Sequence, residues 1–491
     1  MTAISTKSNK ITTVLLIAIL LGGFLARLYR FNGPVADWHS WRQADTSAVS
    51  RNFVAHGFDV LHPKFEDLSN VPSGLDNPQG YRFVEFPIYN VAQAGLYDLF
   101  HILTLEEWGR IVSIISSLFA SLFLFLLLKS RASTRIALFA AFFNTFIPFN
   151  IYYSRTILPD PSMIMAVLGS IYFFNKFLLI KQKKSDKVLP YVWYLLAILF
   201  SITSLLLKPY AIFFILPIVV LVYYEYKLKM FWNWQLWVYG IVSVIPLLLW
   251  RHYIASYPEG IPANAWLLNG NGIRFRPSFF RWMLYERLTR LISGYIGIAL
   301  FGLGVFIGKK QKNKLFLYSF LVSSIIYICV FATGNVQHDY YQILIIPSIA
   351  IFYGIGANYL YELPWKKSSL PVFKILLLLI TILMLYFGWA IVKDYFNINN
   401  PSIIVAGKAV DELTPKNAKV IANYNGDTSF LYQTNRNGWA SYERDLPGMI
   451  KLGADYLVIA NPLPSDFSFA RAYRIVKRTN QYVIFNLRAS P

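Results

Sequence analysis

Long apolar segments alternate with short basic loops along the first four fifths of the chain. Because a bilayer core of about 30 Å requires roughly 20 apolar residues per helical crossing, the pattern predicts eleven membrane-spanning helices. They are 12–30, 108–128, 136–154, 160–180, 190–207, 210–226, 234–250, 288–307, 315–333, 341–361 and 370–391. The stretch 87–105 is also apolar but carries Asn90, Gln93, Asp98 and His101, so we expect it to be interfacial or only partly inserted.

The loops between these segments carry most of the excess of basic over acidic residues. They are Lys7 and Lys10; Lys129, Arg131 and Arg135; Lys181, Lys183, Lys184 and Lys187; Lys227 and Lys229; Lys309, Lys310, Lys312 and Lys314; and Lys366 and Lys367. Short loops rich in Lys and Arg mark the cytoplasmic side of a membrane. If the N-terminus is cytoplasmic and the eleven segments alternate, every cluster falls on that side. A full crossing at 87–105 would place the clusters that follow it, including Lys181–Lys187 and Lys309–Lys314, outside.

The tail of the chain has a different pattern. KVIANYN and DYLVIANP are typical of short strands, LPGMIKLGA of a helix, and RIVKRTNQYVIFNLR of a hairpin closed by Thr479–Asn480. We therefore predict a polytopic α-helical membrane domain over 1–391, with a large first extracytoplasmic loop at 31–107, and a small extracytoplasmic α/β domain over 392–491.

Composition agrees with a membrane protein. Of the 491 residues 56% are hydrophobic and 14% are charged, against about 25% charged in soluble proteins, which argues against a soluble enzyme and a disordered chain. The net charge of +21 follows from the basic loops, so we expect no nucleic-acid partner. The single cysteine, Cys329, excludes a disulfide framework.

Charged residues from seven separate places meet on the predicted outer side. They are Asp37, His39, Arg42, Asp45, Glu85, Arg155, Asp160, Lys208, Arg287, His338 and Asp339. Charges at a membrane edge are costly, so a cluster indicates function, and carboxylates mixed with cations suit acid/base chemistry on an anionic substrate. For any single residue, a solvated loop charge explains the pattern equally well.

The first outer loop predicts an amphipathic helix from Ser40 to Phe53 on the membrane surface, beside the interfacial residues Trp38 and Trp41. Arg42 and Asp45 are three residues apart and share one face of this helix. They form either part of a functional site or a simple surface ion pair.

Several motifs together resemble the GT-C glycosyltransferases, in particular the group of dolichyl-phosphate-mannose protein mannosyltransferases and the bacterial aminoarabinose transferase of lipid A. They are YRFVEFPIY after the surface helix, SRTILPDPSM at the outer start of a helix, LLKPY, and YYQILIIPSIAI, and the resemblance covers about residues 10–360. It implies an enzyme of the bacterial inner membrane that transfers a sugar from a polyprenyl-phosphate carrier to a glycan, lipid or protein acceptor on the extracytoplasmic face, by one inverting displacement.

The resemblance also implies roles for individual residues. Glu85, Asp160 and Lys208 match polar positions of the family, and Lys208 would bind the donor phosphate. Arg42 stands where the catalytic aspartate is expected, so Asp37 and Asp45 remain equal alternatives for the general base. The remaining residues that we expect to bind substrate are His39, Arg42, Arg155, Arg287, His338 and Tyr340.

The family comparison bears on metal binding as well. In the aminoarabinose transferase, a glutamate equivalent to Glu85 and a histidine hold a metal ion. Here Arg287 stands in place of that histidine, and arginine cannot coordinate a cation; His338 could substitute from another loop. We therefore expect no obligatory cofactor, with a divalent ion beside Glu85 as the alternative.

Two other functions remain open. A secondary transporter has a similar size, but it would carry charges near the bilayer midplane and repeated halves, and neither is visible in the sequence. A polymerase or ligase that joins whole lipid-linked glycans would share the donor and the outer site.

The predicted topology is testable by labelling cysteines introduced into the loops. The Lys181–Lys187 loop should react only from the cytoplasmic side, and residues 31–107 and 392–491 only from outside, because of the Lys/Arg bias. Cytoplasmic labelling of the tail would overturn the topology.

Overall fold

The computed structural model describes residues 2–183, 188–364 and 371–490. It divides into two compact units. The first, here called the helical unit, comprises Met1–Phe31, Ile111–Leu249 and Asn264–Asp394. The second, the α/β unit, comprises Asn32–Arg110, Trp250–Ala263 and Tyr395–Pro491.

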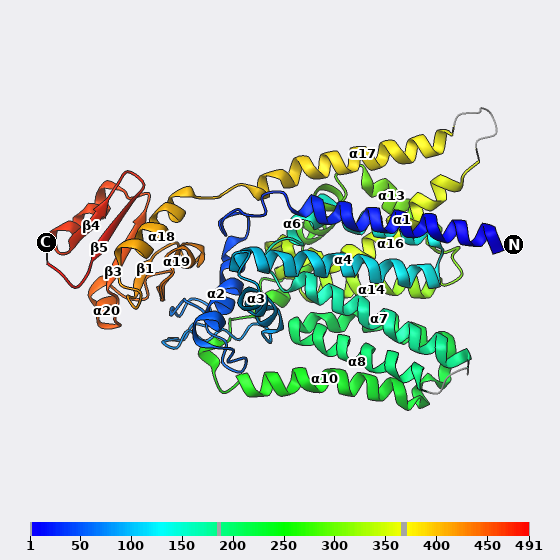
Figure 1. Cartoon of the computed structure of the whole chain (residues 1–491), viewed down its shortest axis with the longest axis horizontal. Helices are drawn as coiled ribbons and strands as arrows, with labels where there is room; N and C mark the ends of the chain where they lie inside the picture. Colours follow the sequence, from blue (N-terminus) through cyan, green and yellow to red (C-terminus); the bar gives the residue numbers. More distant parts are fainter. Residues whose placement is uncertain (1, 184–187, 365–370, 491) are drawn as a thin grey trace. The chain divides into compact units, whose positions relative to one another are not determined.

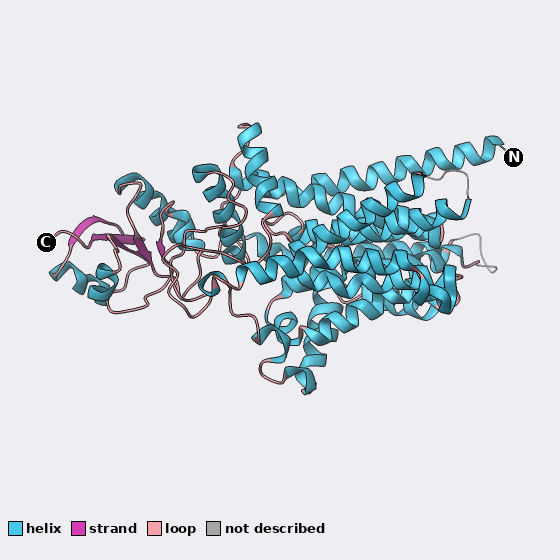
Figure 2. Ribbon diagram, turned by 90° about the horizontal axis from the view of Figure 1, so that it is seen from below, coloured by secondary structure: helices cyan, strands magenta, loops and turns pink. Residues whose placement is uncertain are grey.

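Long helices dominate the helical unit, and in both views they run side by side with similar axes (Figures 1 and 2). The longer ones are α1 (Thr2–Arg27), α4 (Leu105–Arg131), α5 (Thr134–Phe146), α7 (Asp160–Lys183), α8 (Leu189–Leu207), α9 (Leu216–Tyr226), α10 (Trp234–Ile254), α13 (Gly297–Gly308), α14 (Lys314–Val330), α16 (Ile346–Glu362) and α17 (Val372–Val392). Between them lie the shorter elements α6 (Pro148–Tyr153), η1 (Pro209–Ile215), η2 (Lys227–Trp232), α11 (Trp266–Asn269), η4 (Ile273–Phe275), α12 (Pro277–Phe280), η5 (Arg281–Ile292), α15 (Ala332–Gln337), η6 (Asp339–Ile345) and η7 (Lys393–Phe396).

Each of the eleven predicted crossings is helical, and eight of them are long and apolar enough to span a membrane within the described ranges. The other three are shorter or broken. Residues 136–154 divide into α5 and α6, and α14 has 17 residues. The predicted crossing at 288–307 is broken, because the chain bends by 113° between η5 and α13.

The bend has a local cause. Gly294 and Tyr295 adopt left-handed backbone conformations, with φ of 49° and 59°. A Cβ atom on Gly294 would lie 2.2 Å from the carbonyl oxygen of Met384, so only glycine permits this close approach to α17. Counting the bent pair as one span gives nine candidate spans.

Glycines also set the packing of α13 against α16. A Cβ on Gly304 would lie 1.8 Å from the carbonyl oxygen of Phe352, and one on Gly356 would lie 2.4 Å from that of Leu300. The two backbones are therefore in contact, as is typical of membrane helices that pack through small residues. The span that contains α16 is 89% buried, which makes it the central helix of this unit.

Polar groups lie at both ends of the helical unit. Since α7 and α8 pack as neighbouring helices joined by a short connection, the start of α7 at Asp160 and the end of α8 at Leu207 share one end. The described basic residues at 129–135, 227–229 and 309–314 lie at the junctions on the opposite end. Lys184, Lys187, Lys366 and Lys367 lie outside the described residues.

The α/β unit contains a five-stranded sheet with the order β2-β1-β3-β5-β4. β1 (Val420–Ala422) is parallel to β2 (Gly438–Trp439) and to β3 (Tyr456–Ala460), while β5 (Tyr482–Asn486) is antiparallel to β3 and to β4 (Arg474–Arg478). The helices of this unit are α2 (Ser40–His56), α3 (Ile88–Leu99), η3 (Pro258–Gly260), α18 (Pro401–Leu413), α19 (Ser429–Gln433), α20 (Leu446–Lys451) and η8 (Pro464–Arg471). The predicted strands, helix and hairpin of the tail are all confirmed.

The first loop belongs to this unit rather than to the helical one. Asp67 forms a parallel bridge with Gly438, and the Leu68 amide donates to the Gly438 carbonyl at 2.7 Å. The sequence predicted that 31–107 is a loop of the membrane domain, whereas in the structure Asn32–Arg110 and the tail belong to the same compact unit. Within the first loop, α3 has 12 residues, too few for a full crossing, as expected for the polar stretch 87–105.

Candidate functional site

Helix α2 buries polar side chains inside the α/β unit. Arg42, Gln43, Asp45, Thr46, Ser47 and Ser50 are all buried. The predicted helix is therefore confirmed, but its buried face is polar. The prediction of an amphipathic helix on the membrane surface was wrong in this respect. Helical spacing indicates that one face is buried, but it does not indicate which segment covers that face.

Two ion pairs hold α2 in place. Arg42 contacts Glu85 at 2.5 Å, and Arg82 pairs with Asp45; all four side chains are at most 13% exposed. The second carboxylate oxygen of Asp45 accepts a hydrogen bond from the Thr428 hydroxyl at 2.6 Å. Arg42 and Asp45 therefore each belong to a separate buried ion pair, and not to the simple surface pair that was one of the two predicted alternatives.

Asp37 lies just before α2 and is 4% exposed. Its carboxylate accepts a hydrogen bond from the amide of Gln43 at 2.7 Å, and its carbonyl accepts from Asn399 at 2.8 Å. Asp37 does not cap α2, because the N-cap residue is His39, with φ of 55° and no side-chain cap. Beside them, Trp38 stacks on Tyr395 with ring centroids 5.1 Å apart.

A second buried network surrounds Arg51, which the sequence analysis did not select. Its guanidinium contacts Glu66 at 2.8 Å and Glu106 at 3.4 Å, and lies 3.7 Å from the ring centroid of Tyr432. The Tyr432 hydroxyl donates to Glu106 and lies 2.9 Å from the Ser47 hydroxyl, from which it can accept. No local pattern predicts this network, because its members come from α2, the first loop and the tail.

Two carboxyl groups of the first loop have strongly raised pKa values. Burial raises the pKa of Glu66 to about 7, although the Arg51 guanidinium acts in the opposite direction. Burial also raises the pKa of Asp67 to about 6, against hydrogen bonds from Ser69 and the Ala440 amide. Burial disfavours the charged form of a carboxyl group.

The helical unit contains a separate polar cluster. Lys208 follows α8 and its ammonium lies 3.4 Å from the carboxylate of Asp160, the first residue of α7. Their side chains are 7% and 3% exposed, and the Tyr210 hydroxyl donates to Asp160 at 3.0 Å. Lys208 is therefore a buried ion-pair partner rather than a side chain that extends into the lipid headgroups. The charges also suit the helix dipoles, with the anion at an N-terminus and the cation at a C-terminus.

Aromatic residues extend this cluster. The ring centroid of Tyr210 lies 5.3 Å from that of Tyr327 and 6.0 Å from that of Tyr341. Tyr341 in turn stacks on Tyr340 at 4.6 Å, and His338 stacks on Tyr340 at 5.6 Å. His338 and Tyr340 were predicted from the sequence, whereas Tyr210, Tyr327 and Tyr341 were not. In the sequence these three tyrosines cannot be distinguished from interfacial aromatic residues.

Three of the predicted residues make contacts elsewhere in the helical unit. Arg155 donates to the carbonyl of Arg30 at 3.1 Å, and Arg287 donates to that of Val336 at 2.7 Å. Asp339 accepts a hydrogen bond from the Tyr153 hydroxyl. These side chains position backbone segments near the ends of helices.

The arrangement of ligands bears on the alternative of a divalent ion beside Glu85. Among the residues that the structure describes, no group of three or more His, Cys, Asp or Glu side chains could hold a metal ion. The Glu85 carboxylate lies against the Arg42 guanidinium instead. The residues present therefore do not fit the metal site of the resembling enzyme.

Known proteins share this fold. Residues 86–250 match the family model of dolichyl-phosphate-mannose-protein mannosyltransferases. The crystal structure of ArnT from Cupriavidus metallidurans bound to undecaprenyl phosphate matches with 14% identity and a TM-score of 0.64, over 96% of this chain and 97% of that one. No curated protein sequence matches the chain.

Two larger enzymes also resemble it. Archaeal oligosaccharyltransferase AglB from Archaeoglobus fulgidus, in complex with an inhibitory peptide and a dolichol-phosphate, matches with 10% identity and a TM-score of 0.55, over 96% of this chain and 74% of that one. Arabinofuranosyltransferase AftD from Mycobacteria matches with 12% identity and a TM-score of 0.58, over 97% of this chain and 41% of that one. The chain thus has the GT-C glycosyltransferase fold of a polytopic membrane protein.

The raised carboxyl pKa values predict how stability depends on pH. Between pH about 4.5 and 7 the folded chain holds a proton on Glu66 that the unfolded chain has lost, so stability falls as the pH rises through this window. Between pH 5 and pH 8, Glu66 should lower the free energy of unfolding of the full chain by on the order of 2 kcal/mol. Glu66→Gln should remove this part of the pH dependence, which melting curves recorded at both pH values measure. The control Glu412→Gln, at an exposed residue, should retain it. An unchanged slope in Glu66→Gln would contradict the assignment.

Proposed function

We propose that this chain is an integral membrane glycosyltransferase that transfers a sugar from a polyprenyl-phosphate carrier to an acceptor on the extracytoplasmic face. The shared GT-C fold supports it, as do the structures of ArnT bound to undecaprenyl phosphate and of AglB in complex with a dolichol-phosphate. The family-model match also includes the segment with Asp160 and Lys208. The basic loops support a cytoplasmic N-terminus in a bacterial inner membrane.

The buried pair of Lys208 and Asp160 carries the proposal most directly. A buried ammonium beside the Asp160 carboxylate, which also accepts a hydrogen bond from the Tyr210 hydroxyl, can exchange its counter-ion for a phosphate without being desolvated again. A polyprenyl phosphate leaves the sugar as an anion, and a preorganised cation stabilises charge that develops in the transition state. In this proposal Lys208 binds the donor phosphate, while Asp160 and Tyr210 orient the ammonium.

The acceptor side of the reaction needs a general base. Asp45 is a poor choice, because Arg82 and Thr428 engage both of its carboxylate oxygens. Asp37 accepts a hydrogen bond from the side-chain amide of Gln43, which orients its carboxylate. We therefore assign the base to Asp37 and a positioning role to Asp45, Arg82, Arg42 and Glu85.

The proposed step is one displacement. Asp37 takes the proton of the acceptor hydroxyl, and the acceptor oxygen forms a bond to the anomeric carbon as the bond to the phosphate oxygen breaks. The electron pair of that bond leaves with the polyprenyl phosphate, and the configuration at the anomeric carbon inverts.

Transfer of a whole glycan is the second candidate function. The match to an oligosaccharyltransferase, AglB, favours it, although the match to ArnT covers a larger share of the partner chain. A secondary transporter is disfavoured by the fold. Donors with one sugar and with an oligosaccharide, offered to the same purified protein, distinguish the two transferases.

Lys208→Ala should lower kcat/KM for a radiolabelled polyprenyl-phosphate sugar by about 100-fold, since hydrogen bonds to charged groups contribute about 1.5–3 kcal/mol. Lys208→Ala alone leaves the Asp160 carboxylate buried without the Lys208 ammonium. The double variant Lys208→Gln with Asp160→Asn avoids this buried charge and should show the same loss of activity in a folded protein. Lys229→Ala, at the basic end of the helical unit, is the matched control. Donor affinity equal to wild type in both variants would eliminate the role.

Asp37→Asn should lower kcat by roughly 100-fold or more, the usual effect of removing a general base, while the melting temperature stays close to wild type. Asp45→Asn should instead destabilise the α/β unit, because Arg82 loses its buried counter-charge, which costs about 3–5 kcal/mol. Turnover and melting temperature measured on both variants separate base from positioning residue. A fully active Asp37→Asn enzyme would refute the assignment.

A further inference from the structure

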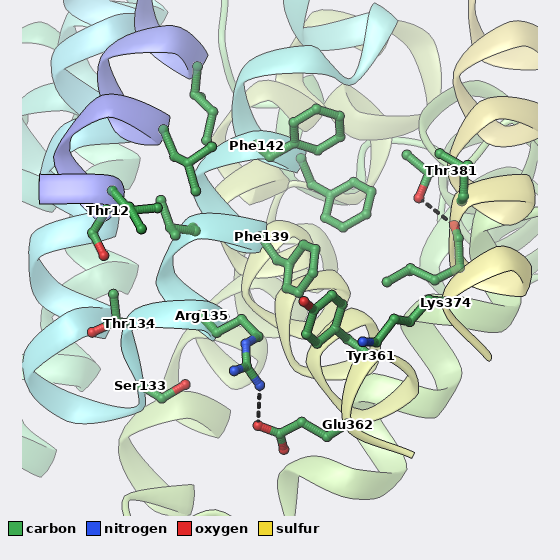
Figure 3. A pocket seen from close by; sticks show the side chains of 17 residues that line it. Thr12, Ser133, Thr134, Arg135, Phe139, Phe142, Tyr361, Glu362, Lys374 and Thr381 are labelled. Carbon is green, nitrogen blue, oxygen red and sulfur yellow. Dashed lines mark hydrogen bonds and ion pairs between the residues drawn. The ribbon is translucent and has the colours of Figure 1, made fainter. Parts of the chain in front are cut away.

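The helical unit contains a large groove at the end opposite to the Lys208–Asp160 pair. It has a volume of about 1240 Å³ and is lined by side chains of α1, α5, α16 and α17 (Figure 3). Arg135 and Lys374 lie in the first turns of α5 and α17, and Glu362 ends α16, so the polar mouth is at the basic end of this unit. The proposed reaction makes no use of this groove.

The mouth carries an excess of positive charge. The Arg135 guanidinium lies 4.8 Å and the Lys374 ammonium 4.6 Å from the ring centroid of the same residue, Tyr361. Glu362 pairs with Arg135 at 2.6 Å (Figure 3). Two cations thus face one carboxylate around a single ring, and an additional anion between them would reduce their mutual repulsion.

The body of the groove is apolar. It is lined by Ile11, Leu15 and Ile19 of α1, Leu138, Phe139 and Phe142 of α5, and Leu377 and Leu378 of α17. Ile11 is 55% exposed and Leu378 is 58% exposed. These side chains leave room for apolar atoms that the described residues do not supply.

The dimensions match one leaflet of a bilayer. Arg135 lies at the mouth and Phe142 lies deeper (Figure 3), and the seven-residue step between them along α5 corresponds to about 10 Å. The hydrocarbon of one leaflet is about 15 Å thick, half of a 30 Å core. A lipid with its head group at the mouth would therefore have most of one acyl chain along the groove.

We propose that this groove binds a glycerophospholipid with an anionic head group. Its phosphate lies between Arg135 and Lys374, and one acyl chain packs against α1, α5 and α17. The charge of the mouth selects an anionic over a zwitterionic head group. The groove takes most of one acyl chain, whereas it would take a much smaller share of a longer polyprenyl chain. The lipid fills the space between α1, α17 and the rest of the unit.

Native mass spectrometry of the delipidated full chain in detergent tests the proposal. Phosphatidylglycerol should be retained over phosphatidylcholine, and Lys374→Gln should weaken its binding about fivefold, because each basic residue near a lipid head group contributes about 1 kcal/mol. Lys129→Gln, a basic residue of the same end that does not line the groove, is the charge control. Leu378→Trp should fill the groove and lower retention, whereas Leu379→Trp, on the same helix outside the lining, should not.

Four outcomes would overturn the proposal. They are equal retention of the two phospholipids, equal effects of Lys374→Gln and Lys129→Gln, displacement of phosphatidylglycerol by equimolar polyprenyl phosphate, and displacement by millimolar inorganic phosphate. The third result would identify a carrier site, and the fourth would identify a site that binds phosphate without a lipid chain.

Discussion

The ion pair between Lys208 and Asp160 joins the end of α8 to the start of α7 in the helical unit. Its ammonium and carboxylate lie 3.4 Å apart and are almost completely buried. Removing one partner of such a pair leaves an uncompensated charge, at a typical cost of about 3–5 kcal/mol. The start of α7 and the end of α8 must therefore stay together, and the chain after Lys208 continues in the short helix η1, which brings Tyr210 onto Asp160.

The same constraint organises the α/β unit. Helix α2 buries charged and polar side chains, and Arg42, Asp45 and Arg51 each have counter-charges supplied from outside the helix. Thr428 and Tyr432 of the tail complete these contacts. The tail is therefore part of the structure that positions Asp37 and Asp45, and a truncated chain would lose hydrogen bonds to the acidic residues of the first loop.

Local pattern was enough to predict most of the fold. Apolar segments gave the helices, and alternation gave the strands of the tail, because both depend on neighbouring residues. The bend at Gly294 was not predicted, since the close approach of a distant carbonyl, that of Met384, is not visible in the local pattern. In the site, motifs marked Asp160 and Lys208, but Thr428 lies 383 residues from its partner Asp45, a separation that no local pattern spans.

The most direct test of the account is a structure of the purified full chain with a polyprenyl phosphate bound. The account predicts that the lipid phosphate lies about 3 Å from the Lys208 ammonium, the distance of a charge-assisted hydrogen bond. A phosphate bound elsewhere, with Lys208 still paired to Asp160 as in the ligand-free chain, would contradict it.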